Sequence, residues 1–257
     1  MIELDRIYQE NCMEGMKRIP DGSVDLIICD LPYGVLNKYN EEASWDRCLP
    51  LDALWKEYLR VAKPNAAIIL FGQGMFTAEL MQSQPKLWRY NMIWKKGNRI
   101  TGFLNVNKMP LRNHEDICVF YRKQPTYHPQ ITLGAVYHKR NNRTSEQTNR
   151  CWGKITTAPT TISNKKYPVS ILDFPKDHPA IHPTQKPVAL VAWLINTYSN
   201  PGDTVLDNCG GSCTTAEAAV ITDRRFIVFE WKEEYADIGN RRVKTARMMR
   251  GSRIEFE

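Results

Sequence analysis

Asp30, Leu31, Pro32 and Tyr33 form the first segment whose residue types and order could do chemistry. A carboxylate, a carbonyl in a turn that proline stiffens, and an aromatic ring can together bind a flat ring that bears an amino group. The carboxylate and the carbonyl would accept the N–H bonds while Tyr33 stacks on the face of the ring. A turn whose tyrosine packs against the core is the commoner use of such a segment, so this interpretation needs support from other motifs.

A second segment, Asp207 to Thr215, consists mostly of small residues between an expected strand and an expected helix. Small residues let a ligand approach the backbone, and a helix amino terminus offers free N–H groups. Glu230 follows at roughly the spacing at which an acid binds ribose hydroxyls in nucleotide-binding βαβ units. Since the Gly-x-Gly-x-x-Gly and Gly-Lys-Ser/Thr phosphate patterns are absent, a nucleoside without phosphates is favoured. A glycine-rich turn that only packs a helix against a sheet explains this segment equally well when it is taken alone.

These segments lie in two blocks that alternate buried strands with helices. Such alternation favours an α/β domain with a mostly parallel central sheet and helices on both faces. Between the blocks, residues 122–176 are rich in Pro, Thr and Asn and predict loops. We expect one domain over residues 1–257, with an inserted loop-rich region at 95–178. The predicted strands are 24–30, 66–71, 91–95, 116–121, 204–207 and 226–230, and the predicted helices are 51–62, 75–81, 187–198, 215–221 and 233–248.

Positive charge is concentrated in the middle of the chain. The sequence has 35 Lys and Arg against 28 Asp and Glu, and residues 95–176 hold 15 of these bases but only four of the acids. The bases are interleaved with Trp, Tyr, His, Asn and Thr, which suits contacts to phosphates and base edges of a nucleic acid. The alternative is a solvated surface that only keeps the protein soluble. The residues that this pattern predicts to contact a nucleic acid are Lys95, Lys96, Arg99, Lys108, Arg112, Lys139, Arg140 and Arg143.

The composition argues against several other classes of protein. It is 42% hydrophobic and 25% charged, which is ordinary for a globular protein and disfavours disorder. No apolar run approaches the roughly 18 residues of a membrane span, and the first residues do not resemble a signal peptide, so we expect a cytoplasmic protein. Seven cysteines without a Cys-x-x-Cys pair predict reduced thiols and no metal site.

Together, these motifs resemble those of the S-adenosylmethionine-dependent DNA amino-methyltransferases, in the permuted class whose catalytic motif precedes the cofactor motif. The family's Asp-Pro-Pro-Tyr is matched by residues 30–33, and its Asp-Pro-Phe-x-Gly-Ser-Gly-Thr loop by residues 207–214. The most specific match is HPTQKP at 182–187, which in this family leads into the helix beside the methionine part of the cofactor. The resemblance covers nearly the whole chain. It implies a Rossmann-like methyltransferase fold, circularly permuted, with a DNA target-recognition region inserted between the motifs.

The resemblance also implies roles for the matched residues. Asp30 and the carbonyl of Leu31 would accept hydrogen bonds from the exocyclic amino group of a base flipped out of double-stranded DNA, and Tyr33 would stack on that base. Within this family, Asp rather than Ser at position 30 favours N6 of adenine over N4 of cytosine. Glu230 would hold the ribose of the cofactor and Trp231 its adenine ring. The residues implied to bind S-adenosylmethionine are Asn11, Cys12, Asp30, His182, Thr184, Gln185, Lys186, Asp207, Cys209, Gly211, Ser212, Cys213, Thr214, Glu230 and Trp231.

Three residues depart from the family's motifs. Leu31 replaces the first proline of the catalytic motif, which adds an N–H and frees φ, so we expect a looser turn. Cys209 replaces the usual Phe, and Cys213 replaces a Gly whose backbone conformation Cys adopts less easily. The alternative to an active enzyme is therefore a catalytically inactive DNA-binding relative with a weakened cofactor site.

Several alternatives stay open within the enzyme reading. An N4-cytosine or an RNA substrate fits the same motifs, whereas a protein-glutamine methyltransferase would have Asn in place of Asp30 and the opposite motif order. No motif specifies the recognised DNA sequence or tells whether the enzyme belongs to a restriction-modification pair. Members of the family often pair, but no stripe of residues here identifies an interface, so the sequence leaves the oligomeric state open between a monomer and a homodimer.

Overall fold

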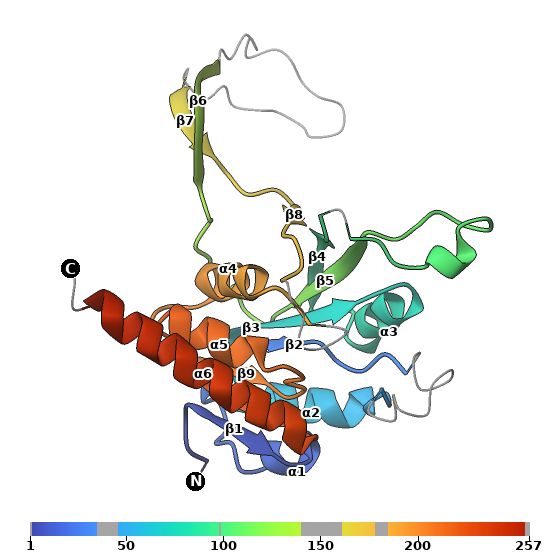
Figure 1. Ribbon diagram of the computed structural model, residues 1–257, viewed down its shortest axis with the longest axis vertical. Helices are drawn as coiled ribbons and strands as arrows, with labels where there is room; N and C mark the ends of the chain where they lie inside the picture. Colours follow the sequence, from blue (N-terminus) through green and yellow to red (C-terminus); the bar gives the residue numbers. More distant parts are fainter. Residues whose placement is uncertain (1, 35–45, 98, 140–160, 178–184, 255–257) are drawn as a thin grey trace. The chain divides into compact units, whose positions relative to one another are not determined.

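The computed structural model describes residues 2–34, 46–97, 99–139, 161–177 and 185–254. These residues divide into two compact units, of which the larger contains residues 1–128 and 170–257 and the smaller contains residues 129–169. Figure 1 labels the elements. The helices are α1 (Cys12–Met16), α2 (Leu51–Val61), α3 (Met75–Ser83), the 3-10 turn η3 (Phe103–Asn105), α4 (Val188–Tyr198), α5 (Thr214–Ile221) and α6 (Glu233–Ile254). The strands are β1 (Arg6–Gln9), β2 (Val24–Cys29), β3 (Ala62–Gly72), β4 (Trp88–Lys95), β5 (His114–Phe120), β6 (Thr132–Lys139), β7 (Thr161–Lys166), β8 (Ile171–Asp173), β9 (Thr204–Asp207) and β10 (Arg225–Glu230).

Within the described residues, the larger unit is built on one sheet of eight strands in the order β1-β10-β9-β2-β3-β5-β4-β8. All neighbouring strands pair in parallel except β5, which runs antiparallel to both β3 and β4. The prediction of a mostly parallel sheet is confirmed. No helix in the described part of the chain is long and apolar enough to span a membrane.

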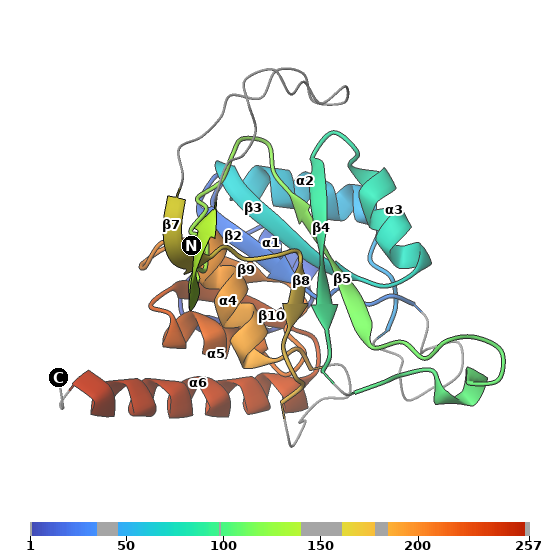
Figure 2. The ribbon, with the colours of Figure 1, turned by 90° about the horizontal axis from the view of Figure 1, so that it is seen from above.

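Helices cover both faces of this sheet, as predicted. Strand β2 pairs with β3 on one side and β9 on the other, and it is buried on both faces, which explains its unbroken apolar run. Leu26 and Ile28 pack with residues of α4, α5 and α6. Ile27 and Cys29 pack with residues of α1, α2 and α3. Figures 1 and 2 show α4, α5 and α6 grouped on one side of the sheet.

The smaller unit is narrower than the predicted insert. It contains β6 and β7, which pair antiparallel with a register shift between Leu133 and Tyr137. Strands β5 and β8, which lie within the expected insert at 95–178, belong to the large sheet. The role of this range as a target-recognition region stays a prediction. Strands β6, β7 and β8 fall in the stretch predicted as loops. Polar residues interrupt the apolar residues of β6 and β7, and β8 has only three residues, so none of them shows a clear period.

The order of the strands creates a topological switch point between β9 and β2. From β9 the chain continues through α5 to β10 on one side, and from β2 it continues through α2 to β3 on the other. Open α/β sheets bind ligands beyond the carboxyl ends of the strands at such a point. Asp207 is the last residue of β9 and Asp30 is the first residue after β2, so the fold brings both carboxylates to this position.

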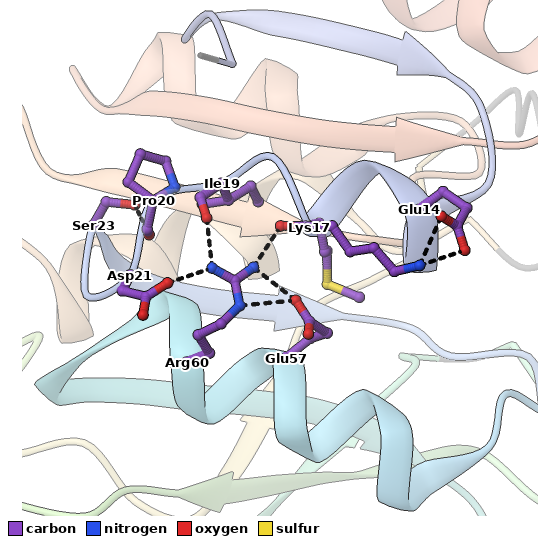
Figure 3. Close-up of polar contacts among 9 residues, drawn as sticks. Glu14, Lys17, Ile19, Pro20, Asp21, Ser23, Glu57 and Arg60 are labelled. Atoms are coloured by element: carbon purple, nitrogen blue, oxygen red, sulfur yellow. Dashed lines mark hydrogen bonds and ion pairs between the residues drawn. The ribbon is translucent and has the colours of Figure 1, made fainter.

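Arg60 in α2 fixes the way the chain enters β2 (Figure 3). Its Nη1 donates to the carbonyl of Ile19 (2.7 Å) and the carboxylate of Asp21 (2.6 Å). Its Nη2 donates to the carbonyl of Met16 (2.8 Å) and the carboxylate of Glu57 (2.7 Å). The guanidinium therefore ties the end of α1 and the segment before β2 to α2, through the carbonyls of Met16 and Ile19 and the carboxylate of Asp21.

Candidate active site

Asp30 has hydrogen-bond partners on both carboxylate oxygens. Oδ1 accepts from the hydroxyl of Tyr33 (3.0 Å), and Oδ2 accepts from the ammonium of Lys186. The Tyr33 ring lies 4.8 Å from the ring of Phe76, with 31° between the ring planes. Burial raises the pKa of Asp30 above its ordinary value, although the Lys186 ammonium opposes this shift. The turn after β2 therefore presents a carboxylate whose position is fixed from two directions.

Lys186 lies between two carboxylates. Besides Asp30, its Nζ lies 3.2 Å from Oε2 of Glu115 in β5. The ammonium also lies 4.9 Å from the centre of the Phe71 ring, within cation–π range. Glu115 pairs in turn with Lys96, directly after β4. Burial would raise the pKa of Glu115, but the ammonium groups of Lys186 and Lys96 hold it below its ordinary value.

This cluster changes the roles expected for two lysines. Lys96 is only 3% exposed and forms an ion pair with Glu115, so its ammonium cannot reach a DNA phosphate. The prediction that Lys96 contacts DNA is corrected on this ground. Lys186 was expected to bind S-adenosylmethionine, and the structure places its ammonium against Asp30. Its contact with the cofactor stays a prediction. Sequence reasoning missed Glu115, whose signal is an acid at the start of β5, two residues before the apolar run of that strand.

Other residues of the expected cofactor segment contribute to the start of α4. Gln185 Nε2 donates to Oδ2 of Asp177 (3.3 Å), and the same oxygen accepts from the backbone N–H of Val188 (3.0 Å). Asp177 thus satisfies a free N–H group in the first turn of the helix. His182 and Thr184 lie outside the residues that the structure describes.

Asp207 and Glu230 both bind the loop between β9 and α5. Asp207 is buried and accepts hydrogen bonds from the hydroxyl of Thr215 (2.6 Å) and the N–H of Cys209 (3.0 Å). Burial raises the pKa of Asp207 to about 6. Glu230 accepts from the N–H of Gly211 (2.6 Å), and burial raises its pKa as well. The two carboxylates therefore fix the loop from its two neighbouring strands.

Cys213 has the left-handed conformation that the sequence analysis expected for a residue in place of glycine. Its φ is 55°, and it is the residue before the first turn of α5. Its thiol is buried, and a Cβ on Gly239 of α6 would lie 2.5 Å from the sulfur. The side chain therefore packs against α6, which leaves Cys213 only backbone groups with which to contact a ligand.

Open space lies beside Gly211 of the same loop. A Cβ at Gly211 would have no heavy atom within 4 Å, whereas a Cβ at Gly210 would lie 2.5 Å from Cγ1 of Val228. The exposed indole of Trp231, at 65%, follows directly after Glu230. The loop thus has a packed side and an open side, and the open side can admit a ligand to its backbone.

Asn208 is a buried residue of this loop that the sequence analysis did not assign a role. Its Oδ1 accepts a hydrogen bond from the hydroxyl of Tyr58 in α2. Its Nδ2 lies 3.7 Å from the sulfur of Cys12 and 3.5 Å from that of Cys209. The amide therefore joins α2 and α1 to the loop. Its signal in the sequence is a polar side chain directly after a buried strand.

The residues expected to contact an adenine ring lie at adjacent strand ends. Strand β1 pairs with β10 so that Gln9 is opposite Glu230, and the Gln9 amide donates to the carbonyl of Trp231 (3.4 Å). Asn11 and Cys12 follow β1 after one intervening residue, Glu10. The Asn11 side chain accepts from the N–H of Met13 (2.9 Å) and so caps α1. Their contact with a cofactor stays a prediction.

Comparison with known proteins identifies the family. A family model described as DNA methylase (N6_N4_Mtase) matches residues 24–241, which is most of the chain. The chain belongs to this family of DNA methylases. The methylase is 28% identical over 255 residues to the DNA adenine methyltransferase YhdJ of Escherichia coli, and the alignment covers 95% of this chain and 84% of that protein. It is 26% identical over 262 residues to the type II methyltransferase M.HinfI of Haemophilus influenzae, with 94% and 68% covered.

Solved structures show the same fold as the methylase. The M1.HpyAVI-SAM complex matches with a TM-score of 0.60 at 20% identity, over 93% of this chain and 98% of that one. The cytosine-N4-specific PvuII DNA methyltransferase matches with a TM-score of 0.66 at 17% identity, over 92% and 85%. These matches confirm the prediction of a Rossmann-like methyltransferase fold.

The connection between β4 and β5 carries three of the bases predicted to contact DNA. Arg99, Lys108 and Arg112 are all exposed there, and residues 97–113 contain no acid. Lys95 pairs with Asp173 at 2.6 Å on the surface. Lys139 ends β6 in the smaller unit, and Arg140 and Arg143 lie outside the described residues. In the part of the methylase that the structure describes, no three His, Cys, Asp or Glu side chains are arranged to hold a metal ion.

Proposed function

We propose that this methylase transfers a methyl group from S-adenosylmethionine to N6 of an adenine in double-stranded DNA. The observation that carries the proposal is the position of Asp30 and Asp207, at the carboxyl ends of the paired strands β2 and β9. This arrangement puts an acceptor for an amino group beside a loop that can hold a nucleoside. The relationship to an adenine methyltransferase of Escherichia coli supports adenine as the base.

The residues at these strand ends fit S-adenosylmethionine. When bound, this molecule supplies an electrophilic methyl group on a positively charged sulfur, and it also carries ribose hydroxyls and an ammonium group. The carboxylates of Asp207 and Glu230 are acceptors for such hydroxyl and ammonium donors. The open side of the loop at Gly211 gives access to the backbone, and the exposed Trp231 offers an apolar face for a flat ring.

Asp30 would align the amino group of the base. A carboxylate oxygen has more than one lone pair, so Asp30 can accept from the base while it keeps its bonds to Tyr33 and Lys186. The carbonyl of Leu31 would accept the second N–H, which directs the nitrogen lone pair toward the methyl donor. The nitrogen becomes positively charged as it is methylated, and the negative charge of Asp30 stabilises that cation. No covalent bond between enzyme and base is required.

Double-stranded DNA is the proposed partner, and the basic residues on the β4–β5 connection and beyond β6 are proposed to contact its phosphates. The bases in this proposal are Arg99, Lys108, Arg112, Lys139, Arg140 and Arg143. A homodimer is a further proposal that follows from the family resemblance alone.

Mass spectrometry of nucleosides tests the proposal. The purified protein is incubated with unmethylated plasmid DNA and S-adenosylmethionine whose methyl group is isotopically labelled, and the DNA is then digested to nucleosides. We expect labelled N6-methyladenine. Label only in N4-methylcytosine would refute adenine as the substrate. Absence of label together with absence of cofactor binding in a calorimetric titration would identify an inactive DNA-binding relative.

A variant of the aligning carboxylate provides the control. Asp30→Ala should abolish methylation while DNA binding stays within about twofold, because Asp30 aligns the amino group and does not contact phosphate. An equal loss of DNA binding would contradict this assignment.

A further inference from the structure

Four charged side chains form a row that ends at Asp30. In order, Lys96 pairs with Glu115, Glu115 lies 3.2 Å from Lys186, and Lys186 pairs with Asp30. They come from four separate segments: the end of β4, β5, the segment before α4, and the turn after β2. Their formal charges alternate in sign and sum to zero.

The row is buried everywhere except at Asp30. The side chains of Lys96, Lys186 and Glu115 are 3%, 8% and 12% exposed, whereas that of Asp30 is 24% exposed. Buried ion pairs gain little stability over apolar residues of the same size, because each charge must be removed from water. Stability alone therefore does not explain why two lysines and a glutamate lie behind the carboxylate that is proposed to face the base.

Lys186 affects Asp30 in two opposite ways. Its ammonium favours the ionised carboxylate, which is the form that can accept hydrogen bonds from an amino group through both oxygens. The same positive charge opposes the cation that forms on the amino nitrogen during methyl transfer. The site benefits from Lys186 only if a second negative charge offsets part of that effect, and Glu115 is placed to do so.

We propose that Glu115 is a positioning residue for methyl transfer, because it holds the ammonium of Lys186 between two carboxylates and offsets its charge. This proposal deepens the proposed function and rests on it. Lys96 keeps Glu115 ionised and fixes its other carboxylate oxygen. Lys96, at the start of the β4–β5 connection, therefore supports Asp30 through Glu115 and Lys186.

Other charged or titratable groups also face Asp30. Lys176, after β8, is half-buried, and burial together with the nearby lysines Lys96 and Lys186 lowers its pKa. Asp207 at the end of β9 interacts with Asp30 as a like charge. The titratable groups that interact with Asp30 are therefore Cys29, Tyr33, Glu115, Lys176, Lys186 and Asp207. Glu115 raises the pKa of Asp30 by repulsion, so its removal should lower that pKa.

Glu115→Gln tests the proposal, since it removes the charge and keeps the shape of the side chain. We expect kcat to fall about tenfold at pH 7.5, because Lys186 then opposes the developing cation without compensation. The KM for S-adenosylmethionine and the Kd for DNA should stay within twofold of wild type. The acidic limb of the pH profile of kcat should move to lower pH, since Asp30 stays ionised more easily without the neighbouring Glu115 charge.

Two further variants separate this role from a structural one. Glu115→Asp retains the charge and should restore the acidic limb to its wild-type position. Asp116→Asn is the matched control, because Asp116 is the next residue of β5 and accepts from the hydroxyl of Thr77 (2.7 Å), away from this row. It should leave kcat and the pH profile unchanged. All rates are expressed per cofactor-binding site, so that partly unfolded protein does not contribute.

The outcomes distinguish this proposal from the proposed function. If the wild type methylates adenine and Glu115→Gln matches it in both kcat and pH profile, the positioning role is wrong and the proposed function stands. A fall in kcat with an unmoved acidic limb would also refute the role, as would an equal fall in Asp116→Asn. If the wild type methylates no DNA, the proposed function fails and the positioning role fails with it.

Discussion

Replacing Lys186 with methionine should destabilise the protein by an amount that grows with pH. Methionine has a similar length and keeps apolar contact with Phe71, over which the ammonium now lies. The change removes the ion-pair partner of Asp30, whereas Glu115 keeps its pair with Lys96. Removing one partner of a buried pair costs about 3–5 kcal/mol.

Protonation limits this cost and makes it depend on pH. Protonating a carboxyl group of ordinary pKa costs about 1.4 kcal/mol for each pH unit above that pKa, or about 5 kcal/mol at pH 7.5. In Lys186→Met the folded state has the higher carboxyl pKa, so it binds more protons than the unfolded state and loses stability as pH rises above about 4. The expected loss relative to wild type is about 3–5 kcal/mol at pH 7.5 and about 2 kcal/mol at pH 5.5.

Urea unfolding of both proteins at pH 5.5, 6.5 and 7.5 measures this loss. The control is Lys95→Met, which breaks the exposed pair between Lys95 and Asp173 and should cost less than about 1 kcal/mol at every pH. A loss in Lys186→Met that is the same at all three pH values would show that Lys186 contributes through packing alone. That result would refute the electrostatic reasoning.

Three further predictions concern stability and DNA binding. Arg60→Met should lower the free energy of unfolding by about 2–3 kcal/mol in urea titrations, because the carbonyls of Met16 and Ile19 lose the guanidinium as a donor, and Arg60→Lys should recover less than half of it. Tyr58→Phe should lower the free energy of unfolding by about 1–3 kcal/mol and raise the KM for S-adenosylmethionine, because the buried amide oxygen of Asn208 loses its partner. An unchanged KM would show that this hydrogen bond does not support the cofactor site. Neutralising Lys139, Arg140 and Arg143 together should reduce the slope of log affinity for DNA against log salt concentration by about 3, while cofactor affinity is unchanged. An unaltered slope would exclude these three residues from the DNA-contacting surface.

The strands that hold the expected motifs were predictable because they are buried on both faces. The apolar runs of β2, β9 and β10 identify them clearly as buried strands. Asp30 directly follows β2, and Asp207 and Glu230 are the last residues of β9 and β10. Strand β1, with the sequence RIYQ, is short, polar and at the edge of the sheet, so its pattern gives no clear period. Its position follows from pairing with β10, which local sequence does not encode.

The charged row behind Asp30 was not predictable for a related reason. Glu115 reaches Lys186 only because β5 inserts between β3 and β4, which is a pairing between distant segments. A lysine in the HPTQKP segment suits the carboxylate of a cofactor as well as it suits Asp30, so its sequence context does not choose between them. Lys96 illustrates the same limit, because a base at the end of a strand is usually exposed and this one is buried by its pairing with Glu115.

The strand ends that carry the site are costly for the folded protein. Burial raises the pKa of Asp30, Asp207 and Glu230, which means that each of these carboxylates is less stable as an anion here than in water. Of these three carboxylates, Lys186 offsets this cost only for Asp30, and its ammonium is shared between Asp30 and Glu115. A ligand with a sulfonium and an ammonium group would bring positive charge to the same edge of the sheet. The unfavourable ionisation of these carboxylates in the free protein is therefore a physical reason for the site to bind a cationic nucleoside, since binding relieves a cost that folding imposes.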